Sequence, residues 1–132
     1  MSTRGRILVV DDERTIRQMF QLVLGEAGYE VAEAASGEEG VDLVRAQPWD
    51  LIFLDLVLPG LDGVETYKRM KVLRDVLIIV MMSAYFEQME SRLKETLSLE
   101  ALQACLRKPF SNADILAVVA RVLGPQTSGG AS

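Results

Sequence analysis

The chain has 132 residues, the length of one domain with a core of its own, and about half of them are apolar. Its net charge is −5 and it has no basic stripe, which argues against direct binding of nucleic acid by this domain. It has no histidine, which excludes Ser-His-Asp and Cys-His catalytic sites, so any metal must be held by oxygen, as Mg²⁺, Ca²⁺ and Mn²⁺ are.

Short apolar runs alternate along the chain with longer amphipathic stretches, a pattern typical of strands and helices in turn. The strands expected are residues 7–10, 29–34, 51–54, 76–82 and 102–106, the second of them at an edge. The helices expected are 16–27, the stretch between Ser36 and Pro48, 64–71, 86–97, and the stretch between Ser111 and Gly124.

Turn and capping residues mark the ends of these elements. Gly28 is expected to end the first helix, and Gly124 with Pro125 the last. Ser36 followed by Glu39 predicts a capping box. Residues 1–125 therefore read as one domain, and residues 126–132, which are small and polar, as a disordered tail or the stub of a linker.

Five strands alternating with five helices predict the α/β class: a doubly wound (βα)5 three-layer sandwich around a five-stranded parallel sheet. Strands buried on both faces should read as continuous apolar runs. The runs at 7–10, 51–54 and 76–82 do so. In this architecture ligands bind beyond the carboxyl ends of the strands.

Charged and hydroxyl side chains stand at just those ends: Asp11, Asp12, Asp55, Ser83 and Lys108. Two carboxylates about 4 Å apart repel by roughly 4 kcal/mol at an effective dielectric constant near 20. A divalent cation removes that repulsion and attracts phosphate, and Mg²⁺ binds through one or two carboxylates plus phosphate oxygens. The sequence therefore predicts a site for Mg²⁺, with Mn²⁺ as a substitute, that handles a phosphoryl group.

Four motifs, in order and at fitting spacings, resemble the receiver domain of two-component response regulators, whose fold is flavodoxin-like. They are residues 9–13 (VVDDE), 53–63 (FLDLVLPGLDG), 82–85 (MSAY) and 108–110 (KPF). The resemblance covers about residues 5 to 124. Any one motif alone is weak, whereas the four together are highly specific.

The resemblance implies a role for each residue of the site. Asp55 would accept a phosphoryl group from a histidine on a sensor kinase or phosphotransfer protein, as a switch rather than a turnover enzyme. Dephosphorylation would be slow and self-catalysed. The other implied roles are Mg²⁺ ligation by Asp12, Asp55, the Val57 carbonyl and, mostly through water, Asp11; contacts to the phosphoryl oxygens from Ser83, the Ala84 amide and Lys108; and a cis bond before Pro109.

The resemblance also implies an output surface, on the fourth helix, fifth strand and fifth helix, for an output domain, a target protein or a phosphorylation-dependent homodimer. The chain departs from the family there. Cys105 stands where receivers usually carry an aromatic residue, so the usual swing of that side chain is not available. Tyr85 and Phe86 are alternative switch residues, but nothing in the sequence supports either.

Two rival functions are weaker. A haloacid-dehalogenase-like phosphatase also forms an aspartyl phosphate beside Mg²⁺, but needs a second aspartate where Val57 stands, and is usually longer. A nucleotide-binding module would need a glycine-rich phosphate loop, which is missing. The lone Cys105, the lack of a signal peptide and the lack of a membrane-length apolar run predict a cytoplasmic protein.

Overall fold

The computed structural model describes residues 4–97 and 105–124. Its centre is one five-stranded parallel sheet in the order β2-β1-β3-β4-β5, which confirms the predicted class. The strands are β1 (Arg6–Val10), β2 (Glu30–Ala34), β3 (Leu51–Asp55), β4 (Ile79–Ser83) and β5 (Leu106–Arg107). The described helices are α1 (Arg14–Glu26), α2 (Gly37–Ala46), α3 (Gly63–Leu73), α4 (Phe86–Thr96) and α6 (Asn112–Leu123).

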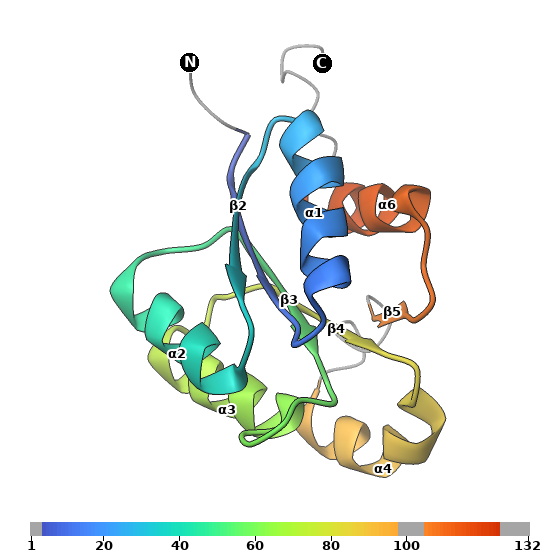
Figure 1. Ribbon diagram of the computed structural model, residues 1–132. Helices are drawn as coiled ribbons and strands as arrows, with labels where there is room; N and C mark the ends of the chain where they lie inside the picture. Colours follow the sequence, from blue (N-terminus) through green and yellow to red (C-terminus); the bar gives the residue numbers. More distant parts are fainter. Residues whose placement is uncertain (1–3, 98–104, 125–132) are drawn as a thin grey trace.

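Helices cover both faces of the sheet, with α1 and α6 on one side and α2 and α3 on the other (Figure 1). Side chains alternate between the two faces along each central strand, as the pleat requires. Leu8 and Val10 of β1 belong to the core under α2 and α3, whereas Ile7 and Val9 belong to the core under α1 and α6. This double burial explains why β1, β3 and β4 each contain a run of four apolar residues without a polar one between them.

The fourth and fifth strands differ from the prediction. The apolar run 76–82 was expected to be strand throughout, but β4 begins at Ile79, and Val76 is 83% exposed. The chain turns at Asp75 and Val76, where Lys71 Nζ donates to the Asp75 and Leu77 carbonyls, and the ladder to β3 starts only at Ile79. The last expected strand is the two-residue β5, and residues 102–104 lie outside the described residues.

The predicted helix caps are present, with one change of partner. Ser36 Oγ accepts from the Glu39 N–H at 3.1 Å, but the Glu39 carboxylate accepts from Ala35 N–H rather than from Ser36. Ser111 forms a complete capping box with Asp114. Gly28 follows α1 with a φ of +99°, a conformation that glycine adopts without steric cost.

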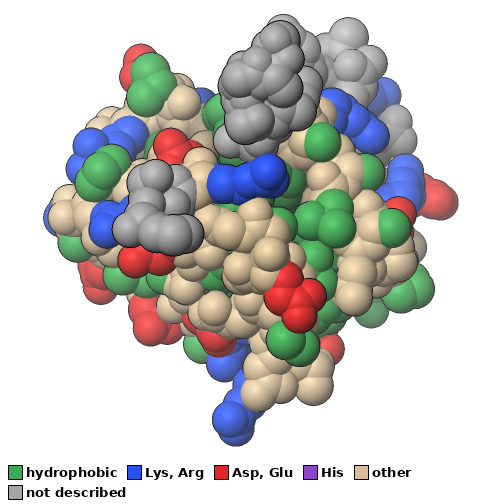
Figure 2. Space-filling view, turned by 90° about the horizontal axis from the view of Figure 1, so that it is seen from above, with side chains coloured by type: hydrophobic (Ala, Val, Ile, Leu, Met, Phe, Trp, Pro, Cys, Tyr) green, Lys and Arg blue, Asp and Glu red, His purple; other side chains and the backbone are tan. Residues whose placement is uncertain are grey.

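The end of the molecule where β1 begins and α1 ends shows no field of a single charge among the described residues. Figure 2 looks onto this end, and acidic and basic side chains are interspersed there with apolar ones. Within residues 4–97 and 105–124, no helix combines the length and the apolar character that crossing a bilayer requires.

Candidate functional site

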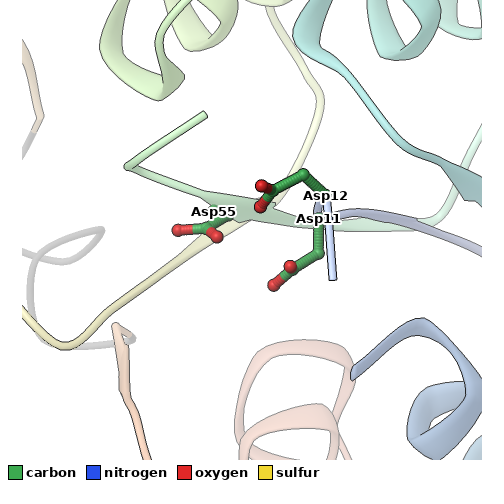
Figure 3. A group of neighbouring side chains, drawn as sticks. All are labelled: Asp11, Asp12 and Asp55. Atoms are coloured by element: carbon green, nitrogen blue, oxygen red, sulfur yellow. The ribbon is translucent and has the colours of Figure 1, made fainter. Parts of the chain in front are cut away.

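The carboxyl ends of β1 and β3 bring three carboxylates together. One oxygen from each of Asp11, Asp12 and Asp55 lies within 4.8 Å of the others, and the side chains face a common space (Figure 3). Asp11 and Asp55 are buried, whereas Asp12 is exposed. The sequence predicted this convergence, because neighbouring parallel strands end at the same edge of the sheet.

Lys108 follows β5 directly and inserts its ammonium group among these carboxylates. Its Nζ lies 2.8 Å from Asp11 Oδ2, 3.0 Å from Asp55 Oδ2 and 3.2 Å from Glu13 Oε1. Asp11 and Asp55 can be buried as charged groups because this cation compensates them. Lys108 was predicted as part of the site, whereas Glu13 had been given no role.

Opposing effects act on the ionisation of Asp55 and Lys108. Burial raises the pKa of Asp55 to about 6. The hydrogen bond from Val57 N–H acts to lower this pKa, the charge of Asp11 acts to raise it, and Lys108 acts to lower it. Burial lowers the pKa of Lys108, but the hydrogen bonds and charges of Asp11 and Asp55 outweigh burial and raise it overall. Lys108 is therefore a fixed positive charge at neutral pH.

An open cleft of about 280 Å³ lies over Asp55. Val57 N–H donates to Asp55 Oδ1 at 3.0 Å, and Ser83 Oγ accepts from Tyr85 N–H at 2.8 Å, so both loops are fixed at the cleft. The residues lining it are Asp12, Glu13, Asp55, Val57, Ser83, Ala84, Tyr85 and Lys108. Most of the predicted site residues at the ends of β1, β3 and β4 thus border one space with Lys108, whereas Asp11 is fully buried and does not line the cleft.

The donor set fits a hard divalent cation. Three carboxylates supply the oxygen ligands that Mg²⁺ and Mn²⁺ prefer, and the cleft leaves room for the waters and phosphate oxygens that Mg²⁺ usually keeps. The partly buried Lys108 ammonium shows that this edge of the sheet already requires positive charge.

The loop after β3 is pressed against Asp55. Gly63 N–H donates to the Leu56 carbonyl at 3.0 Å, and a Cβ on Gly63 would lie 2.3 Å from the Asp55 carbonyl oxygen. Asp62 then caps α3 by accepting from Glu65 N–H at 2.8 Å. A glycine is therefore required where α3 begins, since no side chain fits there.

Comparison with known proteins identifies this arrangement. The family model described as "Response regulator receiver domain" matches residues 7–120. The chain belongs to this family. The receiver thus has the phosphoacceptor role of two-component signalling, and the comparisons lend no support to the phosphatase alternative.

Individual relatives agree with this assignment. The receiver is 36% identical over 118 residues to "Sporulation initiation phosphotransferase F" of Bacillus subtilis (strain 168), covering 89% of this chain and 93% of that protein. It is also 36% identical to "Alkaline phosphatase synthesis transcriptional regulatory protein PhoP" of the same organism, covering 89% of this chain but only 48% of that protein. A solved CheY-like receiver from Methanospirillum hungatei JF-1 superposes with a TM-score of 0.74 at 28% identity, covering 95% of this chain and 98% of that one.

The structure describes all three residues that the resemblance linked to switching. Tyr85 is about half exposed and lines the cleft, and the Lys108–Pro109 bond is cis. Cys105 is partly buried and packs against the core under α2 and α3, and burial raises the pKa of its thiol to about 11. The side chain at position 105 is therefore a packed, protonated thiol rather than an aromatic ring.

Two charged residues at the start of α1 were missed. Glu13 accepts from Lys108, and Arg17 donates to the Asp11 carbonyl oxygen at 2.9 Å. A sequence signal existed for Arg17 but not for Glu13. Arg14 and Arg17 stand in the first four residues of α1, whose first turn contains no acidic residue. Cations are unfavourable at a helix N-terminus, so they suggest a role outside the helix.

Proposed function

We propose that this receiver accepts a phosphoryl group on Asp55 from a phosphohistidine of a sensor kinase or phosphotransfer protein, and that phosphorylation changes its binding to an output partner. The observation that carries the proposal is the position of Asp55. Its carboxylate lies at the floor of an open cleft, beside two further carboxylates and a partly buried lysine.

The transfer forms one bond and breaks another. An Asp55 oxygen attacks phosphorus, the bond between phosphorus and the donor imidazole nitrogen breaks, and that nitrogen keeps the electron pair and takes a proton from water. Mg²⁺ or Mn²⁺, held by Asp12 and Asp55 with Asp11 and the Val57 carbonyl, would neutralise charge on the phosphoryl oxygens.

Residues of this chain hold the transferred group. Ser83 Oγ and the Ala84 N–H border the cleft and would each donate to a phosphoryl oxygen. Lys108 would exchange one of its carboxylate partners for the third phosphoryl oxygen. Glu13 is the partner that it releases most easily, since its side chain is 58% exposed while Asp11 and Asp55 are buried. Phosphoryl transfer needs little beyond such positioning and charge neutralisation.

Replacing Asp55 with asparagine is expected to abolish phosphorylation. The wild-type protein and the variant would be incubated with acetyl phosphate and Mg²⁺, and intact mass and self-association would be followed. The wild type should gain the mass of one phosphoryl group, and the variant none, because an amide oxygen is a poor nucleophile. The proposal fails if the wild type gains no mass, or if the variant gains as much as the wild type.

We also expect the phosphorylated state to last for minutes rather than seconds. Val57 and Tyr85 both line the cleft and are about half exposed, so an apolar and an aromatic side chain stand where a hydrolytic water would approach. Val57→Asn, which can orient a water, should speed dephosphorylation, measured as loss of phosphoprotein mass after the phosphodonor is removed. A wild-type half-life of seconds would contradict this expectation.

The remaining features of the proposal concern partners. The output surface would be α4, β5 and α6, for an output domain, a target protein or a second phosphorylated copy. On this surface Arg107 lies 5.6 Å from the centre of the Phe86 ring and 4.0 Å from Glu87, so β5 and the start of α4 are in contact. We place this exchange in the cytoplasm, where the catalytic domains of sensor kinases work.

A further inference from the structure

We propose that Arg17 is a positioning residue of the metal site. Its guanidinium group holds the peptide group that joins Asp11 to Asp12, and so sets the direction in which the two carboxylates leave the end of β1. The inference rests on the proposed function, since it assigns Arg17 to the metal site of the phosphoacceptor. It concerns a residue that borders neither the cleft nor the three-carboxylate cluster.

Arg17 connects three segments from a sheltered position. Its Nη1 donates to the Asp11 carbonyl oxygen at 2.9 Å, and its Nε lies 2.8 Å from Glu33 Oε1 on β2. Its side chain is only 16% exposed and that of Glu33 31%. A guanidinium fork can hold two acceptors in fixed directions at once, which a lysine ammonium does less well.

The peptide group that Arg17 holds lies just beyond the ladder. β1 ends at Val10, and the Asp11 N–H still continues the pairing to β2 by donating to the Ala34 carbonyl at 3.1 Å. The carbonyl of the same residue is bonded to Arg17 instead. The backbone of Asp11 is thus fixed from β2 on one side and from α1 on the other.

Fixing this peptide group matters most for Asp12. The Asp11 carboxylate is held by its own contacts, since Oδ1 accepts from Glu13 N–H and Oδ2 from Lys108. Asp12 is exposed, so the direction of its side chain depends on the backbone that carries it. Rotation of the peptide group between them would move one metal ligand relative to the others.

The position of Arg17 is costly for the helix and useful for the site. A cation near the N-terminus of α1 opposes the helix dipole. Glu33 compensates this charge from the neighbouring strand, where it is paired in register with Val9 of β1. The Arg17–Glu33 ion pair therefore links α1 to β2 beside β1, the strand that leads into Asp11 and Asp12.

The test is metal affinity measured without phosphorylation. Binding of Mn²⁺ would be followed by electron paramagnetic resonance, and Mg²⁺ by competition, for wild type, Arg17→Ala, Arg17→Lys and the double variant Arg17→Ala with Glu33→Ala. Urea unfolding in EDTA would report metal-free stability. We expect Arg17→Ala to bind at least about tenfold more weakly, as is typical when a partner of a metal ligand is lost.

The double variant separates positioning from simple stabilisation. It removes the Glu33 charge that Arg17→Ala leaves unpaired, so it should regain part of the stability that Arg17→Ala loses in the absence of metal. It should not regain the metal affinity of the wild type. Arg17→Lys retains the positive charge and serves if Arg17→Ala does not fold. It should remain weaker than the wild type, because one ammonium does not reproduce the fork.

A matched control lies at the other end of the same strands. Arg6 Nε on β1 lies 2.8 Å from Glu30 Oε1 on β2, an arginine–glutamate pair at the same distance as Arg17 and Glu33 but more exposed and at the opposite end of the strands from the carboxylates. Arg6→Ala should leave metal affinity unchanged. Arg17 variants that bind Mn²⁺ like the wild type, or a double variant that regains affinity, would overturn the inference alone, whereas a wild type that binds no metal would overturn the proposed function as well.

Discussion

Replacing Gly63 with alanine is expected to lower the free energy of unfolding by about 3 kcal/mol or more. The added Cβ would lie 2.3 Å from the Asp55 carbonyl oxygen and 2.4 Å from Leu56 Cα. Both are backbone atoms, so no rotamer change relieves the contact, and the loop or α3 must move. Because the loop begins directly after Asp55, the last residue of β3, a moved loop should also weaken metal binding. Urea unfolding in EDTA measures the first effect and Mn²⁺ binding the second.

Gly25 offers the matched control within the same protein. It lies inside α1, and a Cβ there would meet no atom within 4 Å. Gly25→Ala should therefore leave stability unchanged or raise it by up to about 1 kcal/mol, since alanine is the better helix former. Equal stability of the Gly63→Ala variant and the wild type would show that the start of α3 has room that these distances exclude.

The convergence of the site was predictable because it depends on topology rather than on side-chain detail. Once continuous apolar runs alternate with helices, the sheet must be parallel and buried on both faces. Asp11 and Asp55 directly follow such runs, and Lys108 comes two residues after the last predicted strand, so they must meet at the same edge. No knowledge of the loops was needed to bring them together.

The features that the sequence did not predict depend on contacts between distant segments. Val76 belongs to an apolar run, yet it is exposed because the ladder to β3 starts only at Ile79. Glu13 and Arg17 are both charged residues at the start of a helix, and the sequence alone does not tell a solvated side chain from one that reaches Lys108 or a carbonyl of the site. The apolar pattern carries no information about which charged residues turn inward.

Lys108→Ala is expected to lower the stability of the metal-free protein and to raise its affinity for Mg²⁺. In EDTA the variant should lose about 3 kcal/mol of stability, because the carboxylates of Asp11 and Asp55 would remain buried without their cation. With Mg²⁺ present, the variant should recover most of that loss, since a divalent cation replaces the missing charge. It should also bind Mg²⁺ more tightly than the wild type, because Lys108 repels a cation that enters the same cluster.

The measurement that tests this prediction is the increase in unfolding free energy from EDTA to saturating Mg²⁺, compared between Lys108→Ala and the wild type. This increase grows with metal affinity. Lys68→Ala removes a lysine of α3 that is exposed to solvent, and should change neither value. A Lys108→Ala variant that behaves like Lys68→Ala would mean that the carboxylates do not depend on the lysine. A larger gain in Lys108→Ala would show that the ammonium group and the metal compete for the same carboxylates. Lys108 would then be free to contact the phosphoryl group when the metal is bound.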